Sequence, residues 1–321
     1  MNHIPRVKFA HLPTPVEKLP NLTSYLGGPQ LLRKRDDQTG LAFGGNKTRK
    51  LEFLIAEAQT QGAKTLVTAG AMQSNHCRQT AAAAAKYGFD CILVLAGEPT
   101  TLPTASFLLD QLLGVEVVWA DWETRVDALH AAFEEAVKAG REPYLVPYGG
   151  SSPTGAVGYA VAIQELMVQN VTPDWIVFPS SSAGTQAGMV AGAQLFGFEG
   201  EILGISVDEP GDVLKERVAN LATQTAAFLG KPTTFKASDI HANADYCAAG
   251  YGVLTTNEIE AVRLFARYEG LLLDPVYTGR AAGGLIDLIR TGFFSADETV
   301  LFWHTGGTPA LFADQYKGLV S

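Results

Sequence analysis

The stretch TLVTAGAMQSNHCRQTAAAAAKYGFDCILVL, residues 65–95, decides the fold of this chain. Residues 65–68 form an apolar, β-branched run that predicts a strand, and 91–95 form a second such run. Between them, the alanine-rich segment 80–86 predicts a helix. From residue 50 onward, short runs of the first kind alternate with longer helical segments. This alternation predicts an α/β fold with mainly parallel, twisted sheets flanked by helices.

The same two patterns place further elements along the chain. The predicted helices are 47–61, 80–86, 106–113, 125–138, 185–195, 256–268 and 279–291, with a short terminal helix after Pro309. The predicted strands are 65–68, 91–95, 115–119, 144–146, 175–178, 202–207 and 299–303. Residues 147–158, rich in Gly, Ser and Pro, are predicted to cross between two domains, whereas 208–250 show no clear pattern.

Length and composition narrow the class of protein. The 321 residues exceed the usual domain size of about 100 to 200. Because 47% of the residues are hydrophobic, there is enough apolar material for two cores, and we expect two domains with a cleft between them. The 33 acidic residues outnumber the 24 basic ones, which leaves a net charge of -9. With this charge and no basic run, nucleic acid is not an expected partner.

Several features bear on the compartment. The cysteines are Cys77, Cys91 and Cys247. They are odd in number and widely spaced, so they offer neither a disulfide framework nor a metal half-site, which predicts a reducing environment. Residues 1–7 contain no apolar stretch and predict no signal peptide. The long uncharged stretches 143–164 and 175–198 are broken by proline, glycine or serine runs. We therefore expect a cytoplasmic protein with no membrane partner.

Lys47 is the first candidate for chemistry. It follows Gly44-Gly45-Asn46 and opens a strongly helical stretch. A lysine at the start of a helix feels the positive end of the helix dipole and, here, the charges of Arg49 and Lys50. These charges favour the neutral amine, which can attack a carbonyl group to form a Schiff base. An ordinary solvated lysine at a helix start is the alternative.

A serine-rich loop is the second candidate. Residues 180–188, Ser-Ser-Ser-Ala-Gly-Thr-Gln-Ala-Gly, lie between a predicted strand and a predicted helix of small residues. Backbone N–H groups converge at such a junction and suit a phosphate dianion, to which Ser181, Ser182 and Thr185 can add hydroxyl donors. The alternative is a βα turn whose small residues serve only close packing.

Further polar residues follow other predicted strands. Ser74 and Asn75 stand where a strand gives way to a helix, so they can help to hold a carboxylate or act as an ordinary helix cap. Tyr251 and Tyr277 occur in turn-like settings, and a tyrosine near a cationic lysine can act as an acid or base. Thr305 follows the last predicted strand, where open α/β sheets bind ligands.

Other signatures fail. Residues 40–45 followed by Asn46, Lys47 and Thr48 nearly form a Walker phosphate-binding loop, but Asn46 is an extra residue. The preceding segment, 33–37, is also not expected to form a buried strand, so nucleotide hydrolysis is not predicted. No GxGxxG fingerprint and no metal-ligand spacing occurs among the six histidines, so neither a dinucleotide nor a metal is expected.

The order of five motifs resembles the D-cysteine desulfhydrase and 1-aminocyclopropane-1-carboxylate (ACC) deaminase family. The motifs are Gly-Gly-Asn-Lys-Thr-Arg-Lys-Leu-Glu (44–52), Gln-Ser-Asn-His (73–76), Ser-Ala-Gly-Thr-Gln-Ala-Gly (182–188), Asp-Pro-Val-Tyr-Thr-Gly (274–279) and His-Thr-Gly-Gly (304–307). The similarity runs from about Pro13 to Phe312. These proteins are fold-type II pyridoxal phosphate enzymes, similar to the tryptophan synthase β subunit.

The resemblance implies roles for these residues. Lys47 would carry the cofactor, and the ring oxygen would be bound by Asn75. The cofactor phosphate would be held near Lys50 by the loop residues Ser181, Ser182, Ala183, Gly184 and Thr185. The substrate would meet Ser74, Asn75 and His76, and would lie between Tyr251 and Tyr277. The cofactor would lie in the cleft between a large domain, 1–46 with 163–321, and a small inserted domain, 47–162, in a homodimer.

One position departs from part of the family. ACC deaminases carry a glutamate after the tyrosine of Asp-Pro-Val-Tyr that pairs with the pyridine nitrogen, whereas this chain has Thr278. Thr305 would then be the partner of that nitrogen, and the ring would be a weaker electron sink. The resemblance therefore implies α,β-elimination from a small amino acid, D-cysteine giving pyruvate, hydrogen sulfide and ammonia. L-cysteate sulfo-lyase, ACC deaminase and a non-catalytic ligand-binding homologue are the alternatives.

Overall fold

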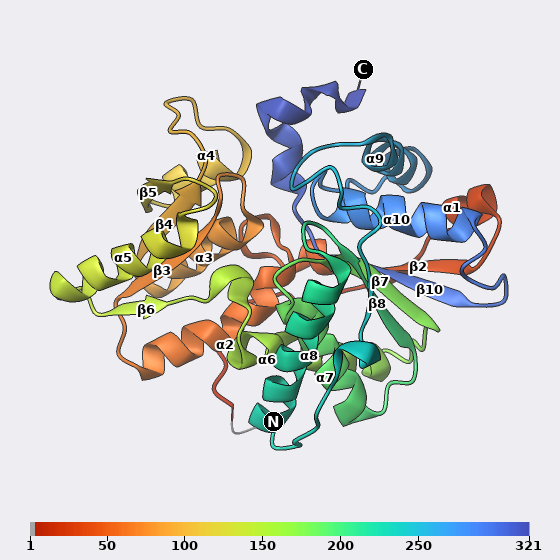
Figure 1. Ribbon diagram of the computed structural model, residues 1–321, viewed down its shortest axis with the longest axis horizontal. Helices are drawn as coiled ribbons and strands as arrows, with labels where there is room; N and C mark the ends of the chain where they lie inside the picture. Colours follow the sequence, from red (N-terminus) through yellow and green to blue (C-terminus); the bar gives the residue numbers. More distant parts are fainter. Residues whose placement is uncertain (1–3, 321) are drawn as a thin grey trace.

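The computed structural model describes residues 4–320, in which the strands form two separate sheets (Figure 1). Met1–His3, which belong to the segment searched for a signal peptide, lie outside the described residues, as does Ser321. The larger sheet has six strands in the order β1-β2-β10-β7-β8-β9, and the smaller has four in the order β5-β4-β3-β6. The predicted α/β fold with mainly parallel sheets is confirmed.

The elements have the following bounds. The strands are β1 (Val16–Lys18), β2 (Gln30–Arg35), β3 (Thr65–Ala71), β4 (Asp90–Ala96), β5 (Glu116–Ala120), β6 (Pro143–Leu145), β7 (Trp175–Ser180), β8 (Glu201–Ser206), β9 (His241–Asn243) and β10 (Thr299–His304). The α-helices are α1 (Pro20–Leu26), α2 (Asn46–Thr60), α3 (Asn75–Tyr87), α4 (Ala105–Leu112), α5 (Arg125–Lys138), α6 (Pro153–Val168), α7 (Gly184–Phe196), α8 (Gly211–Phe228), α9 (Thr256–Glu269) and α10 (Thr278–Arg290). Short 3₁₀ turns include η1 (Asp36–Gln38), η2 (Leu41–Phe43), η3 (Tyr148–Gly150), η4 (Ala237–Asp239), η5 (Thr308–Phe312) and η6 (Asp314–Val320).

The four-stranded sheet is parallel throughout and buried on both faces. Successive side chains of a strand point to opposite faces. Leu66 and Leu93 therefore pack with α2, α3 and α4 on one face, while Val67 and Val94 pack with α5 on the other. This burial on two sides explains why β3 and β4 have continuous apolar runs instead of alternating ones.

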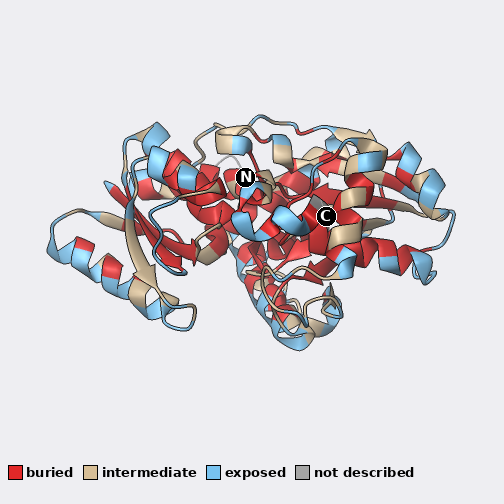
Figure 2. Cartoon of the chain, turned by 90° about the horizontal axis from the view of Figure 1, so that it is seen from above, coloured by how far each residue is buried: buried red, intermediate tan, exposed pale blue. Residues whose placement is uncertain are grey.

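The six-stranded sheet is also covered on both faces, and only β1 pairs antiparallel with its neighbour. Val177 and Phe302 face α1, α9 and α10, whereas Phe178 and Trp303 face α6 and α7. α2 and α6 pack against each other and connect the two sheets (Figure 1). Figure 2 shows that the buried positions concentrate in the sheets and inner helix faces, with the exposed ones on the outer helices.

The Walker loop was excluded partly because residues 33–37 were not expected to form a buried strand, and that prediction is wrong for residues 33–35. Residues 33–35 do form part of a strand, β2, which pairs in parallel with β10. Lys34 is fully buried in this strand. Its Nζ donates to the Thr14 carbonyl at 2.8 Å and to Glu165 at 2.6 Å, and these bonds compensate for the loss of water. A buried ammonium is tolerated when it is paired. For this reason the charged residues 33–35 can belong to an internal strand that their sequence does not predict. The Walker motif still fails, because Asn46 remains an extra residue.

Other parts of the chain also differ from expectation. α6 begins at Pro153, inside the segment predicted to be a crossing loop, and Ser152 caps it by accepting from the Gly155 N–H. The boundary predicted at 162/163 falls within this helix, and the division into domains stays a prediction. The unclear segment 208–250 contains α8 and β9, and the terminal helix is the pair of 3₁₀ turns η5 and η6. No helix within residues 4–320 has the length and hydropathy needed to cross a membrane.

Candidate active site

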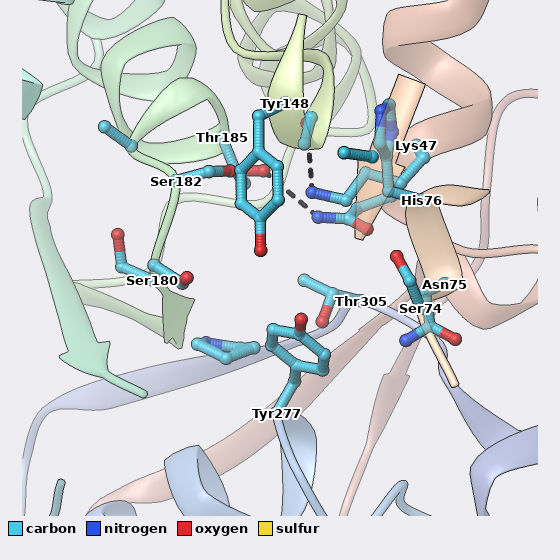
Figure 3. A pocket seen from close by; sticks show the side chains of 16 residues that line it. Lys47, Ser74, Asn75, His76, Tyr148, Ser180, Ser182, Thr185, Tyr277 and Thr305 are labelled. Carbon is cyan, nitrogen blue, oxygen red and sulfur yellow. Dashed lines mark hydrogen bonds between the residues drawn. The ribbon is translucent and has the colours of Figure 1, made fainter. Parts of the chain in front are cut away.

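A cavity lies where the carboxyl ends of strands from both sheets meet (Figure 3). Its lining residues are Asn46, Lys47, Ala69, Ser74, Asn75, His76, Tyr148, Gly149, Pro179, Ser180, Ser181, Ser182, Ala183, Thr185, Tyr277 and Thr305. Ligand sites of α/β proteins occur at this edge of a sheet. None of these lining residues is acidic.

Lys47 lies in the first turn of α2 and points into the cavity (Figure 3). Its Nζ donates to the Gly149 carbonyl at 3.1 Å, and burial lowers the pKa of Lys47 to about 8. The expected cause was partly wrong, because the Arg49 guanidinium points elsewhere and bonds Asp36 at 2.8 Å. Removal from water, and not the charge of Arg49, makes the neutral amine accessible near physiological pH.

The serine loop lies opposite Lys47 at the start of α7. Ser181, Ser182, Ala183 and Thr185 line the cavity, whereas Gly184 does not. The first N–H groups of a helix have no partner within it, so this end of α7 is available to an anion. Ala183 holds a positive φ of 69° where the chain turns into the helix.

Gly184 and Lys50 lie just behind this loop. The Gly184 N–H donates to Ser151 Oγ at 3.1 Å, and a Cβ on Gly184 would lie 2.9 Å from Lys50 Nζ. Lys50 is fully buried, and its Nζ shares the Gly149 carbonyl with Lys47 at 3.0 Å. Burial followed by the nearby Lys47 holds the pKa of Lys50 well below its usual value. Lys50 is therefore close to the loop without lining the cavity.

Ser74, Asn75 and His76 all line the cavity at the start of α3. Ser74 caps this helix, as the alternative reading predicted, by accepting from the Cys77 N–H at 3.2 Å. The His76 ring bonds Thr68 Oγ1 through Nε2 at 2.9 Å, and burial holds its pKa well below the usual range. His76 is therefore a neutral imidazole at physiological pH.

The two candidate tyrosines are neighbours, but only Tyr277 lines the cavity. The hydroxyls of Tyr251 and Tyr277 are 2.8 Å apart, so Tyr251 lies behind Tyr277. Burial raises the pKa of both tyrosines well above the usual value. Both hydroxyls therefore keep their protons and serve as hydrogen-bond donors at physiological pH.

Asp274 organises the turn that presents Tyr277. Its buried carboxylate accepts from the backbone N–H of Val276, Tyr277 and Thr278 at 2.7 to 3.0 Å. Thr278 Oγ1 also donates to this carboxylate at 2.7 Å, and Thr278 is fully buried outside the cavity. The side chain of Thr278 thus points to Asp274, while Thr305 lines the cavity.

The structure adds lining residues that the sequence did not point to: Asn46, Ala69, Tyr148, Gly149 and Pro179. Ser180, the first residue of the candidate loop 180–188, also lines the cavity. Tyr148 and Gly149 follow β6, a neighbour of β3 in the parallel sheet, so their position after a strand was the available signal. Gly149 has φ of 64°, and a Cβ there would lie 2.2 Å from Ser182 Oγ. Glycine thus allows this loop to approach the serine loop.

Comparison with known proteins defines the class to which this fold and cavity belong. Residues 7–306 match the family described as "Pyridoxal-phosphate dependent enzyme". The chain belongs to this family and is an enzyme that uses pyridoxal phosphate.

Particular relatives are similar over nearly the whole chain. Proteins named D-cysteine desulfhydrase from Salmonella choleraesuis and Salmonella typhimurium are each 44% identical over 322 residues, covering 98% of this chain and 97% of theirs. A crystal structure of an "ACC deaminase homologue" is 37% identical with a TM-score of 0.91, covering 99% of this chain and 97% of the other. A pyridoxal 5'-phosphate-dependent aspartate racemase, 18% identical with a TM-score of 0.67 over 95% of this chain and 92% of its own, shares the fold.

The residues present fit pyridoxal phosphate. The N-terminus of α7 and the hydroxyl residues Ser181, Ser182 and Thr185 line the cavity, and together they offer hydrogen-bond donors that suit a phosphate dianion. Lys47, the lining lysine, has a lowered pKa, and its Nζ donates to the Gly149 carbonyl and not to a carboxylate. No group of three His, Cys, Asp or Glu within residues 4–320 is placed to hold a metal ion.

Proposed function

We propose that this enzyme converts D-cysteine to pyruvate, hydrogen sulfide and ammonia. The observation that carries the proposal is the meeting of Lys47, two helix N-termini and Tyr277 in one cavity, in a chain 44% identical to D-cysteine desulfhydrases. Pyridoxal phosphate, when bound, supplies an aldehyde and an electron-withdrawing ring that acidifies the substrate α-carbon. The side chains of the cavity then bind, orient and exchange protons.

Lys47 would hold the cofactor, and its amine moves the proton of the substrate α-carbon. Its amine has a pKa of about 8, so it can accept and return a proton near neutral pH. The buried N-terminus of α7, with the hydroxyls of Ser181, Ser182 and Thr185, holds the phosphate. Lys50, which lies behind that loop, contributes to the binding of the phosphate. These assignments follow the family resemblance, and the position of Lys47 and of the loop residues in the lining of the cavity supports them.

The N-terminus of α3 binds the substrate carboxylate through Ser74 and the neighbouring N–H groups, with His76 completing that wall. Asn75 and Thr305 line the cavity and would hold the cofactor ring, Asn75 at its oxygen and Thr305 at its nitrogen, as the family resemblance implies. Tyr277 donates its hydroxyl proton toward the substrate side chain, and Tyr251 orients it through the 2.8 Å contact between the two hydroxyls. Departure of sulfide completes the elimination.

The cavity favours sulfide over sulfite as the leaving group. A sulfonate substrate needs a cation for its charge. No arginine is among the lining side chains of the described chain, and Lys47, the lining lysine, is engaged by the cofactor. L-cysteate is therefore the less suitable substrate. ACC needs a stronger electron sink, and it is disfavoured because no acidic side chain lines the cavity of the described chain to keep the ring nitrogen protonated. Retention of Lys47 and Tyr277 in one cavity argues against a non-catalytic homologue.

A product assay tests the reaction. We expect pyruvate and sulfide in equal amounts from D-cysteine. Release should be much slower for pyruvate and sulfide from L-cysteine, for pyruvate and sulfite from L-cysteate, and for 2-oxobutanoate from ACC. Sulfite and pyruvate from L-cysteate at the higher rate would replace the proposal with the sulfo-lyase.

Borohydride reduction tests the role of Lys47. We expect the label at Lys47 after peptide mapping, and a loss of about 10²- to 10⁴-fold in turnover for Lys47→Ala. Lys64→Ala, at an exposed lysine paired with Glu142, is the matched control and should keep full turnover. A label at another lysine would contradict the assignment.

We further propose a homodimer in the cytoplasm. Cys77 and Cys91 are buried and unpaired, as in a reducing compartment. Exposed apolar side chains on α4 and η5, which pack together, include Leu112 at 75% and Phe312 at 71% exposure, and they suit burial against a second copy. Light scattering of the purified protein should give twice the mass of the chain. The mass of a single chain would contradict the proposed dimer.

A further inference from the structure

A loop of the smaller sheet reaches the active-site tyrosines of the larger one. Residues 121–124 join β5 to α5, and Trp122 lies in this loop. The centroids of the Trp122 and Tyr251 rings are 5.1 Å apart at an angle of 34°. Tyr251 belongs to the segment between β9 and α9. The contact therefore crosses from the inserted segment to the part of the chain that carries the other sheet.

Tyr251 connects this contact to the cavity. Its ring lies 5.8 Å from that of Tyr277, edge to face, and the two hydroxyls are 2.8 Å apart. Tyr277 lines the cavity. A series of contacts thus runs from Trp122 through Tyr251 to a hydroxyl that faces the substrate.

Arg125 links the same loop to another lining tyrosine. Its guanidinium carbon lies 4.2 Å from the Trp122 ring centroid, and its Nη1 donates to the Trp122 carbonyl. The same carbon lies 5.7 Å from the ring centroid of Tyr148. Tyr148 and Tyr277 point toward one another across the cavity (Figure 3). Arg125 thus supports Trp122 in the orientation that contacts Tyr251.

We propose that Trp122 is a positioning residue for the Tyr251–Tyr277 hydroxyl pair, and that Arg125 holds Trp122 in place. The loop after β5 is then part of the active site, although none of its residues lines the cavity. Reaction rates depend steeply on the placement of groups that act on the substrate, and a shift of about 1 Å can cost 10²-fold. The inference rests on the proposed function, in which the two tyrosines act on the substrate side chain.

Kinetics of the holoenzyme test this coupling. Trp122→Ala should lower kcat at least about tenfold with a smaller change in KM, because the hydroxyl pair is displaced while the carboxylate site is intact. Trp122→Phe keeps a ring against Tyr251 and should stay within about twofold of the wild type. Val126→Ala, at a 49% exposed neighbour on α5, is the matched control and should not change the rate. Wild-type kcat in Trp122→Ala would overturn the proposal.

A double variant separates positioning from general loss of structure. If Trp122 acts through Tyr251, Trp122→Ala in a Tyr251→Phe background should cost less than about twofold further, whereas independent effects would multiply. Multiplying effects overturn the proposal. If Trp122→Ala does not fold, Trp122→Leu, which keeps apolar volume without a ring, takes its place with the same expected loss.

Tyrosine ionisation of the cofactor-free protein gives a readout that does not depend on the reaction. Burial raises the pKa of Tyr251 and Tyr277, so opening their contact with Trp122 should let them ionise at lower pH. We expect an ultraviolet titration of Trp122→Ala to show this earlier ionisation, absent from Trp122→Phe. Identical titrations overturn the proposal. If the wild type releases nothing from D-cysteine, the proposed function fails, and this titration still decides the position of Trp122.

Discussion

At the scale of single residues, the reactivity of this enzyme depends on one half-buried lysine. Burial lowers the pKa of Lys47 to about 8, so its ammonium form dominates below that pH. Only the neutral amine attacks an aldehyde. The rate of cofactor attachment to the cofactor-free protein should therefore rise about tenfold per pH unit up to about pH 8 and level off above it.

Stopped-flow absorbance after mixing the cofactor-free protein with pyridoxal phosphate measures this profile. The reference is Lys64→Ala, which removes an exposed lysine and leaves Lys47 in place; its profile should coincide with that of the wild type. A rate that keeps rising to pH 10 would show that Lys47 has the pKa of an ordinary lysine, and that its burial does not favour the neutral amine.

Thr278 is the residue for which the family resemblance and the structure lead to different expectations about the same variant, Thr278→Glu. Its hydroxyl donates to Asp274, and its side chain is fully buried outside the cavity. Thr278→Glu would remove this bond and bury a second carboxylate beside the first, which we expect to destabilise the protein by about 3 kcal/mol or more. Because the same turn presents Tyr277, turnover of D-cysteine should fall without a gain of ACC ring opening.

Thermal unfolding and product assays of Thr278→Glu check both outcomes, with Thr278→Ser as the control that keeps the hydroxyl and should retain stability and activity. A stable Thr278→Glu enzyme with increased activity on ACC would mean that residue 278 faces the cofactor ring.

At the scale of elements, the link between α4 and the substrate-carboxylate loop depends on Gln73. Its Oε1 accepts from the Ser106 N–H at 2.8 Å, and its Nε2 donates to the Thr104 carbonyl at 3.2 Å. Gln73 directly precedes Ser74, so one side chain caps α4 and holds the start of α3. Gln73→Ala should cost about 1 kcal/mol of stability and raise KM for D-cysteine more than it lowers kcat.

Urea unfolding and steady-state kinetics measure the two effects of Gln73→Ala. Gln111→Ala, at an exposed position on the same helix, should change neither quantity. An unchanged KM in Gln73→Ala would show that the loop keeps its position without the contact to α4.

Elements with continuous apolar runs were predictable from sequence, because both faces of β3, β4 and β7 are buried. β2 was not predictable in this way, because a hydropathy pattern does not show that its charged residues are paired and buried. α8 was missed although Leu214, Val218 and Leu221 have helical spacing and are buried. For the site, the order of the motifs pointed to Lys47 and the serine loop.

Two features could not be predicted from sequence: the orientation of Thr278 and the contact of Trp122 with Tyr251. Both depend on parts of the chain that are distant in sequence.

At the scale of the whole molecule, the two sheets are connected by helices that share a buried network of charges. Arg49 on α2 bonds Asp36 and Glu165 at 2.8 Å each, and Lys34 of β2 bonds Glu165 at 2.6 Å. Glu165 lies on α6, and the Tyr159 hydroxyl donates to Asp36 at 2.6 Å. Since α2 carries Lys47 in its first turn, this network joins the cofactor lysine to the larger sheet.

Loss of Glu165 should therefore affect the whole molecule. Glu165→Ala would leave the buried Lys34 ammonium without its carboxylate partner, while Arg49 keeps Asp36. An unpaired buried charge costs about 3 to 5 kcal/mol. We expect a lower midpoint of urea unfolding and weaker retention of the cofactor on gel filtration, because α2 and α6 would separate. Glu260→Ala, which breaks the exposed pair with Arg290 at 2.7 Å, should cost at most about 1 kcal/mol. Equal midpoints for the two variants would mean that the buried network does not hold the halves of the enzyme together.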